Sequence, residues 1–518
     1  GGGGAGAAGA ASPAPDGWQD LDGHLLGHRV SVRVSPLVRV SEETTALVLE
    51  LTRAADDAAV ADVQSSESGS DDSDNTVYAS TSLGRPLPAR GASGVRLIDT
   101  AGAGRVWTAG SASGGTLELK PGETVSSTVV FTPVDLDEVT VLVPQTGFVR
   151  VRVIDRDAAA DVGVSSEALG KADKIIQDNS GPGDKAAVVP LERYTRALDD
   201  STGTRTTDKD VTVTLASDVT FDSDSYNLTA AADAQLQTVA DQIAQYPDGG
   251  NLDIVGHTDD VADNAHNQTL SENRAGTVKD RLGQLAALTK WQITTTGKGE
   301  TEPAINDTTD EARAANRRVV ITITPTSGTT AKQPGTTGTA TPPAPPASDT
   351  GLPEAQGPVG TGPDGVTVPG PDGKGQITIT LDHVTRNGGL LLGQLIVTTG
   401  PGGTGDTTLT GWLNDPAQVH ASSRGESGGV SAVGITNGLT LLADGQRVYT
   451  ADYILPGSDW HRPLTELYAY EDLKENVTTT ICVVWPDTGQ DTVTVDHPGG
   501  RFDDGYAFRL TDIPVITA

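Results

Sequence analysis

The chain has 518 residues, of which 62 are glycine, 30 are proline and 4% are aromatic, so we expect several small modules and no single large enzyme core. Its 69 acidic residues outnumber the 36 basic ones, giving a formal charge of −33. A field of that sign repels phosphate backbones and anionic lipid heads, so we expect no nucleic-acid partner.

The first 17 residues are rich in Gly, Ala and Pro, which is typical of a disordered tether. A tether after a removed export signal would suit a secreted or lipid-anchored protein, and it would equally suit a truncated chain. The sequence has no run of about 18 apolar residues, so we expect no transmembrane segment. Its single cysteine, Cys482, lies in a β-branched run and is expected to be a buried, inert thiol.

Residues 18–157 alternate apolar with polar positions between Gly, Pro and Asp turns, which predicts an all-β sandwich. Residues 158–207 are mixed and polar. We expect a connector there, with a short helix within residues 181–200.

Residues 326–374 are rich in Thr, Pro and Gly and cannot bury enough surface to offset their ordering entropy, so they are predicted to be a linker. Residues 375–518 return to strand patterns and form a second predicted β-sandwich. The two sandwiches read as divergent copies, because residues 94–109 and 438–451 share a strand-turn-strand pattern ending in Arg-Val-aromatic-Thr-Ala.

Both sandwiches resemble the immunoglobulin-like modules of secreted proteins from high-GC Gram-positive bacteria. The resemblance lies in the strand rhythm and in the turn "KPGET" at residues 120–124. It implies a fold and says little about partners.

The pattern changes within residues 208–325, where strands alternate with helices. Two helices are expected, one within residues 228–247 and the second from about Thr269 to Ala287. The strands around them include "NLDIVGHTD" (residues 251–259) and "RVVITIT" (residues 318–324). A sheet with helices on one face follows, so the whole chain is predicted to be a multidomain α+β protein.

Two charges in this region, Asp259 and Arg274, raise a question about binding. Asp259 directly follows a buried strand, where loops commonly carry binding groups. Arg274 lies at the margin of the apolar stripe of the second helix, where a partly desolvated guanidinium favours a planar anion. The residues alone leave two alternatives open, a salt bridge between the two side chains or a clamp for a zwitterion.

Four segments distinguish these alternatives: "DVTFDSDSYNLT", "GHTDDVADNAHNQTLSENRAGTV", "TTGKGETEP" and "RAANRRVVI". In order and spacing they resemble the peptidoglycan-binding domain of the OmpA-like family, over about 115 residues. The resemblance implies an α/β sandwich whose ligand is the diaminopimelate residue of the cell-wall stem peptide, and it therefore favours the clamp.

The resemblance also implies a role for each matching residue. Asp259 would bind the amino group at the side-chain stereocentre of the ligand, and Arg274 would bind a carboxylate. Asn267, ahead of the second helix, would hydrogen-bond the ligand or hold the loop. This chain has Ala262 where the family usually has glycine, which puts backbone contacts of that loop in doubt.

The remaining binding residues implied by the resemblance complete the pocket. Arg317 would add a second cation, with Arg318 as the substitute. The shape of the pocket would come from Thr258, Leu270 and Phe221.

No catalytic constellation is found in the sequence, so we expect no enzyme activity and no cofactor. His257 has no second histidine at ligand spacing, and a structural role is expected rather than metal binding. His266 lies in the loop near the pocket, where the sequence leaves open a residue that modulates the pocket with pH or an ordinary exposed histidine.

These observations predict a cell-envelope protein, associated with the wall or secreted, that binds the diaminopimelate stem peptide of peptidoglycan non-covalently and presents two β-sandwiches to protein partners. The alternative is an extracellular assembly or adhesion protein that acts through its β-sandwiches and has a ligand-free central domain.

Overall fold

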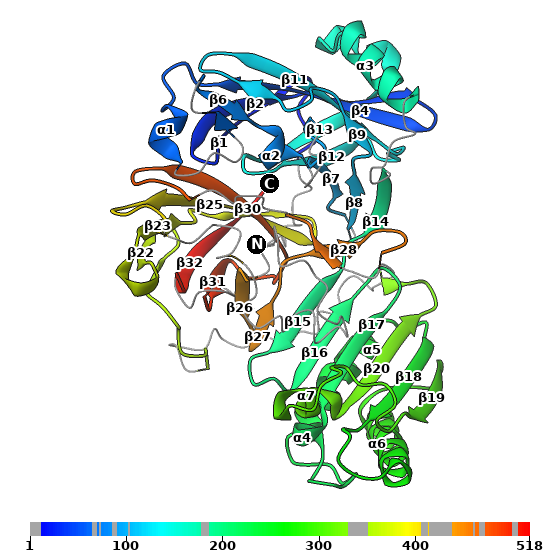
Figure 1. Ribbon diagram of the computed structural model, residues 1–518. Helices are drawn as coiled ribbons and strands as arrows, with labels where there is room; N and C mark the ends of the chain where they lie inside the picture. Colours follow the sequence, from blue (N-terminus) through cyan, green and yellow to red (C-terminus); the bar gives the residue numbers. More distant parts are fainter. Residues whose placement is uncertain are drawn as a thin grey trace, which may run out of the picture.

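The computed structural model describes residues 12–64, 70–71, 74–84, 91–101, 104–177, 186–329, 351–405, 413, 438–458, 461–465, 472–499 and 506–518. Figure 1 shows three units in this part of the chain. We call them the N-terminal β module (residues 19–155), the central α/β domain (residues 202–325) and the C-terminal β module (residues 359–517). Two strands between the first two units, β14 (Ala187–Pro190) and β15 (Arg193–Ala197), are called the crossover strands.

The N-terminal β module consists mainly of strands with one face in the core. In β2, Val30, Val32 and Val34 are buried while the residues between them are exposed, which is the period of two expected for a half-buried strand. The elements are β1 (Gln19–Leu25), β2 (His28–Val34), β3 (Leu37–Ser41), β4 (Thr44–Arg53), α1 (Val60–Val63), β5 (Ser70–Asp71), β6 (Thr76–Tyr78), α2 (Ser80–Leu83), β7 (Arg96–Asp99), β8 (Arg105–Thr108), β9 (Ser111–Ala112), β10 (Glu118–Leu119), β11 (Thr124–Phe131), β12 (Glu138–Val143) and β13 (Gly147–Asp155). After it come η1 (Arg156–Ala158), η2 (Ala160–Val162) and α3 (Ser166–Gln177).

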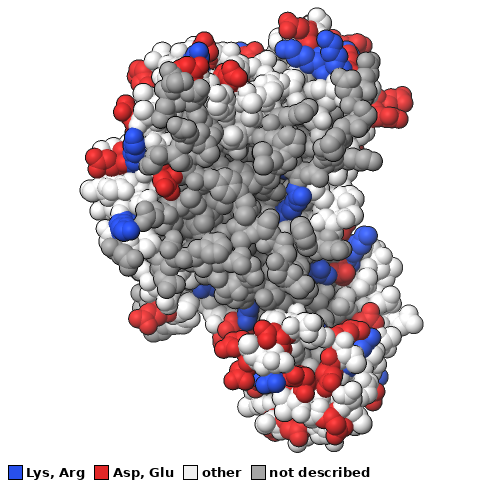
Figure 2. Space-filling model, in the orientation of Figure 1, with Lys and Arg blue, Asp and Glu red and all other residues white. Residues whose placement is uncertain are grey.

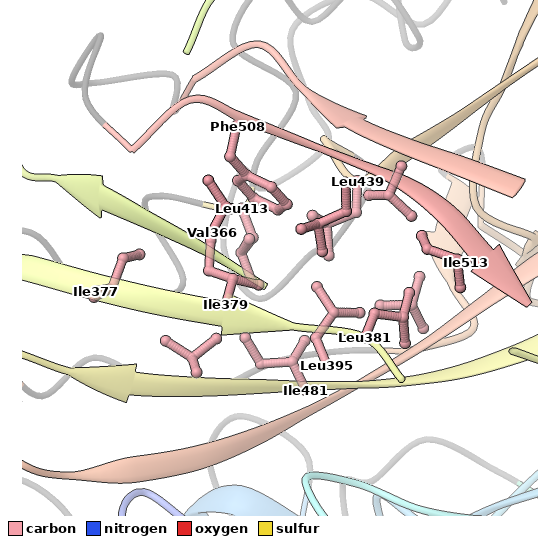
Figure 3. Packing of buried hydrophobic residues seen from close by; sticks show 14 of the residues in the cluster. Val366, Ile377, Ile379, Leu381, Leu395, Leu413, Leu439, Ile481, Phe508 and Ile513 are labelled. Atoms are coloured by element: carbon pink, nitrogen blue, oxygen red, sulfur yellow. The ribbon is translucent and has the colours of Figure 1, made fainter. Parts of the chain in front are cut away.

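The C-terminal β module packs its strands around a separate apolar core. Figure 3 shows this core, with Ile379 from β23 and Leu395 from β25 on the same interior as Phe508 from β32. The elements are β21 (Val359–Thr361), β22 (Val366–Pro369), η4 (Pro371–Gly373), β23 (Gln376–Thr380), β24 (Val384–Asn387), β25 (Leu390–Thr399), β26 (Thr440–Ala443), β27 (Gln446–Val448), β28 (Asp452–Ile454), β29 (His461–Pro463), β30 (Thr478–Pro486), β31 (Thr492–His497) and β32 (Phe508–Thr517).

The linker predicted for residues 326–374 is shorter in the structure. β21 pairs with β32 and β22 pairs with β23, so this module begins before residue 375. Val366 and Val368 are buried on alternate positions, a short strand signal within a Pro/Gly-rich stretch. Residues 330–350 of the predicted linker lie outside the described residues. Both modules are mainly β structure, as predicted, and their assignment as immunoglobulin-like sandwiches stays a prediction.

The central α/β domain is a sheet with two helices on one face, as predicted. Its sheet has the order β19-β18-β20-β17, with β18 and β19 parallel and the other pairs antiparallel. Leu236 of α5 and Val278 of α6 pack against alternate strand residues such as Ile321. The elements are β16 (Thr202–Thr206), β17 (Val211–Ala216), α4 (Ser217–Thr220), α5 (Ala232–Ala244), β18 (Gly250–His257), α6 (Asn264–Leu285), β19 (Trp291–Gly297), α7 (Asp310–Asn316) and β20 (Arg318–Pro325).

The crossover strands replace the short helix predicted within residues 181–200, which was wrong. β14 pairs antiparallel with β8 of the N-terminal β module, and β15 pairs antiparallel with β27 of the C-terminal β module. Because β8 and β27 are the second strands of the two similar hairpins predicted from the sequence, the crossover strands extend corresponding strands in the two modules. β15 also pairs with β16, so the sheet of the central domain runs on into the C-terminal β module (Figure 1).

The two β modules share a hydrophobic interface. One buried cluster contains Leu142 from the N-terminal β module, Leu191 from between the crossover strands, and Leu392 from the C-terminal β module. Cys482 belongs to this cluster, which confirms that the thiol is buried, and burial raises its pKa to about 12. The modules are therefore packed on one another instead of following one another as separate beads.

The predicted tether of residues 1–17 ends earlier than expected. Ala14 is buried; its backbone N–H donates to Glu138 at 2.7 Å, and its carbonyl accepts from Arg152 at 3.1 Å. Residues 1–11 lie outside the described residues. In the described part of the chain, no helix combines the length and the apolar character needed to cross a membrane.

Candidate functional site

The predicted site residues gather at one end of the central α/β domain. α4 follows β17, α6 follows the loop after β18, and Arg317 lies between α7 and β20. Figure 1 shows α4, α6 and α7 at the end of the domain that faces away from the β modules. A ligand bound at this end would therefore not compete with the packing of the modules.

Close packing of α6 on the sheet fixes the site. A Cβ on Gly256 would lie 2.1 Å from the Ser271 backbone carbonyl oxygen, and one on Gly297 would lie 2.5 Å from the Ser271 side-chain oxygen. These two glycines let the helix approach the ends of β18 and β19. The Ser271 hydroxyl then accepts a hydrogen bond from the backbone N–H of Gly299 at 2.9 Å.

Arg274 is a buried cation that holds no salt bridge to any described residue. Only 4% of it is exposed. Its Nε donates to the Ser225 carbonyl at 2.9 Å, and its guanidinium lies 5.1 Å from the centre of the Phe221 ring. Burial lowers the pKa of Arg274, while nearby Asp218 opposes that shift. Its two terminal nitrogens therefore remain as donors that an anion would satisfy.

Arg317, predicted to add a second cation, forms an ion pair with Asp259. Arg317 binds Asp218 through two nitrogens, at 2.7 and 2.8 Å, and binds Asp259 through its third at 2.7 Å. The hydrogen bonds to Asp218 and Asp259 raise the pKa of Arg317 against the opposing effect of burial. With all three nitrogens engaged, Arg317 positions the Asp259 carboxylate instead of offering charge of its own.

Asn267 holds the loop that follows β18. Its side-chain amide donates to the carbonyls of Asp259 and Ala262, at 3.1 and 3.0 Å, and to Glu300 at 2.7 Å. Asn267 lies within the first turn of α6, which begins at Asn264 and not near residue 269 as predicted. The helix was missed there because its first turn is polar, although Asp263 caps it by accepting from the His266 N–H.

Ala262 stands in this loop without backbone strain, since it is absent from the residues with positive φ. The change from the glycine usual in the family therefore does not force the loop into a left-handed conformation.

Three further predicted residues line the same region. Phe221 is buried beneath the Arg274 guanidinium, and Leu270 is half-buried on α6. Thr258 is 3% exposed, and its hydroxyl has no hydrogen-bond partner among the described residues. A buried hydroxyl in this position is a donor and acceptor that a ligand would engage.

Arg318, the predicted substitute cation, hydrogen-bonds to other residues than Arg317 does. It donates to the carbonyls of Asn316 and Glu302, at 3.3 and 3.0 Å, and burial lowers its pKa to about 10. It lies opposite His257 in the β18–β20 pairing. Burial, with a contribution from Arg318, lowers the pKa of His257 to about 4, so this histidine is neutral and structural near neutral pH.

His266 lies at the rim of the site and binds Asp224 at 2.8 Å, with both side chains exposed. This contact joins the start of α6 to the turn that contains Ser225, whose carbonyl accepts the hydrogen bond from Arg274.

The sequence did not single out Asp218, Ser225 or Glu300. Asp218 is the first residue of the first family-like segment and belongs to α4, and its place in that segment is its only sequence signal. Ser225 acts through its backbone carbonyl, which no side-chain pattern reveals.

Opposite charges lie intermixed around this end of the domain. Figure 2 shows red and blue side chains together over the lower unit, the central α/β domain in the orientation of Figure 1. Arg313 pairs with Asp260 at 2.8 Å, next to the Asp218–Arg317–Asp259 group. Acidic and basic side chains of the site thus lie next to one another, although the whole chain is strongly acidic.

Comparison with known proteins places this domain in a family. A sequence model of the OmpA family matches residues 220–317. Outer membrane porin F of Pseudomonas aeruginosa is 38% identical over 102 residues, which are 20% of this chain and 29% of that protein. The putative lipoprotein YfiB of Escherichia coli (strain K12) is 31% identical over 110 residues, and the match covers 21% of this chain and 68% of YfiB. The chain belongs to the OmpA family.

The match to the family covers only part of this chain and part of each relative. The chain spans about a third of the length of the first relatives, 29% and 32% of the porins F from two Pseudomonas species. Among solved structures, the cell wall anchor of the T6SS from Pseudomonas aeruginosa is 28% identical, with 24% of this chain and 90% of that chain covered and a TM-score of 0.22.

Proposed function

We propose that this OmpA-family protein binds peptidoglycan non-covalently, through the diaminopimelate residue of the stem peptide, and that it acts by binding and not by catalysis. The observation that carries the proposal is Arg274, a guanidinium 4% exposed that has no salt bridge to a described residue. A buried cation without an anionic partner is costly unless a ligand supplies the anion.

The chemistry of the ligand matches the charges of the site. The free end of diaminopimelate carries an ammonium and a carboxylate on one carbon. Arg274 would bind the carboxylate through its terminal nitrogens, and Asp259 would bind the ammonium through an oxygen with remaining acceptor capacity. The unsatisfied hydroxyl of Thr258 would complete the polar contacts.

The surrounding residues prepare these contacts before the ligand arrives. Arg317 holds the Asp259 carboxylate, and Asn267 holds the backbone of the same loop. Phe221 supports Arg274 from below, and Leu270 supplies an apolar edge. A site already held in shape loses less entropy on binding.

The protein would act in the cell envelope, secreted or held near the wall by its N-terminal end. Its relatives include outer-membrane proteins and proteins named as lipoproteins, which supports that location. The β modules would present surfaces to protein partners, while the site faces the opposite way (Figure 1).

The test is sedimentation of the full chain with insoluble peptidoglycan of the diaminopimelate type. We expect the wild type to sediment and Arg274→Ala to remain in solution. Arg281→Ala is the matched control, because Arg281 lies on the same helix in an exposed pair with Asp233 and should not change binding. Equal sedimentation of wild type and Arg274→Ala, or none by the wild type, would refute the proposed function.

A further inference from the structure

Three side chains that commonly bind metals meet far from the OmpA-family site, where the chain passes between the crossover strands. Glu192 lies between β14 and β15, Asp452 begins β28 and His461 begins β29. One ligand atom from each lies within 4.8 Å of the other two. The three residues are 8%, 5% and 7% exposed, so the cluster is buried.

The backbone holds this cluster in register. The Glu192 N–H donates to the Asp452 carbonyl at 2.7 Å, and the Asp452 N–H donates back to Glu192 at 3.2 Å. Ile454 of β28 pairs with His461 of β29, which brings the imidazole back to the same place. The side chains of Glu192 and His461 are hydrogen-bonded to each other.

The donor set selects a class of ion. Two carboxylates and one imidazole match Zn²⁺ and similar transition metals, whereas Ca²⁺ and Mg²⁺ favour all-oxygen shells. Ligand atoms about 2.0–2.2 Å from a tetrahedral Zn²⁺ lie roughly 3.3 Å apart, so small side-chain rotations would close the present spacing.

We propose that Glu192, Asp452 and His461 bind one Zn²⁺-type ion, with solvent completing the shell, and that the ion fastens the crossover between the two β modules. Without the ion, the hydrogen bond between the His461 and Glu192 side chains holds the pair together. When the ion binds, the proton of that hydrogen bond goes to solvent and both groups become ligands.

The position of the ion gives it a structural consequence. Glu192 directly precedes β15, the strand that joins the C-terminal β module to the sheet of the central α/β domain. An ion at this point would fix the direction in which the central α/β domain, with the OmpA-family site, projects from the β modules. Binding of the ion does not depend on the ligand of that site.

The test is titration of metal-free, full-length protein with Zn²⁺, followed by calorimetry and by metal content after dialysis. We expect one tight ion per chain and an increase in the Tm. His461→Gln should weaken that site at least about 100-fold. His383→Gln is the matched control, because His383 pairs with Asp382 at the surface, at 2.9 Å, and should leave the tight site unchanged.

A second measurement needs no variant and remains decisive if His461→Gln fails to fold. Crystals of the wild type grown with Zn²⁺ should show an anomalous peak between Glu192, Asp452 and His461. Absence of a tight ion in the wild type, a peak only at other positions, or full retention of binding by His461→Gln would overturn the proposal.

Discussion

Two buried histidines, one in the central α/β domain and one at the crossover, have neighbours of opposite charge. His257 faces Arg318, and burial together with that cation keeps it neutral. His461 faces the carboxylates of Glu192 and Asp452. The same residue type therefore serves as an uncharged structural group in one region and as a candidate metal ligand in the other, and the neighbouring charges make the difference.

The comparison extends to the ligands that the two regions would bind. The OmpA-family site brings together two carboxylates, Asp218 and Asp259, and two guanidiniums, Arg274 and Arg317. This balance suits a zwitterion, which carries both charges. The crossover cluster has two carboxylates and one imidazole, which are donor types that bind Zn²⁺.

The largest expected effect tests the carboxylate half of the site. Asp259→Asn preserves shape and removes the charge that would bind the ammonium, so we expect about a 100-fold loss of muropeptide affinity, about 2.7 kcal/mol. Calorimetric titration of the full chain measures this loss.

The control for that variant is Asp260→Asn, the neighbouring carboxylate that pairs with Arg313 at the surface. We expect unchanged affinity for the control and a thermal transition within a few degrees of wild type for both. Unfolding of Asp259→Asn would instead make the ion pair with Arg317 purely structural.

The next largest effect concerns His257 and the pH dependence of the free energy of unfolding. The folded pKa of His257 is about 4, below its ordinary 6.5, so stability is fully present above pH 6.5 and falls as pH drops toward 4. As the pH falls from about 7.5 to about 5, this one group should lower the free energy of unfolding by about 2 kcal/mol.

His257→Gln should remove that contribution from the pH dependence of urea unfolding. The imidazole titration followed by NMR in the wild type reports the pKa directly. A midpoint near 6.5 would contradict the contrast between the two histidines.

The smallest of these effects tests whether the loop is prepared before binding. Asn267→Ala removes the donor to the carbonyls of Asp259 and Ala262, so we expect about a tenfold loss of muropeptide affinity, about 1.4 kcal/mol. Hydrogen exchange of the amides in residues 259–262 should accelerate. Unchanged affinity with faster exchange would mean that the ligand does not use this loop.

The sequence predicted the central domain well because its signals are local and periodic. The apolar stripe of α5, the buried strand before Asp259 and the family-like segments all appear in the structure where they were expected. The gathering of Asp259, Arg274 and Asn267 followed from the family resemblance. The Asp218–Arg317 pair did not, because 99 positions separate those residues along the chain.

The crossover shows what sequence patterns could not reveal. β14 and β15 each gain their backbone partners from a different module, and their sequences, AVVP and RYTRA, are too short to show a helix or strand period of their own. The Glu192–His461 contact spans 269 positions, and neither residue lies in a recognisable metal motif. Only the pairing of the crossover segment with β28, and of β28 with β29, brings them together.

The central claim is that Asp259 and Arg274 together recognise an ammonium and a carboxylate on one carbon. Diaminopimelate has that group at its free end, whereas the side chain of lysine lacks the carboxylate and would leave Arg274 unpaired. The direct test is calorimetric titration of the full chain with matched muropeptides of the two types. We predict at least about tenfold tighter binding to the diaminopimelate form, about 1.4 kcal/mol, and equal affinity for the two would contradict the account.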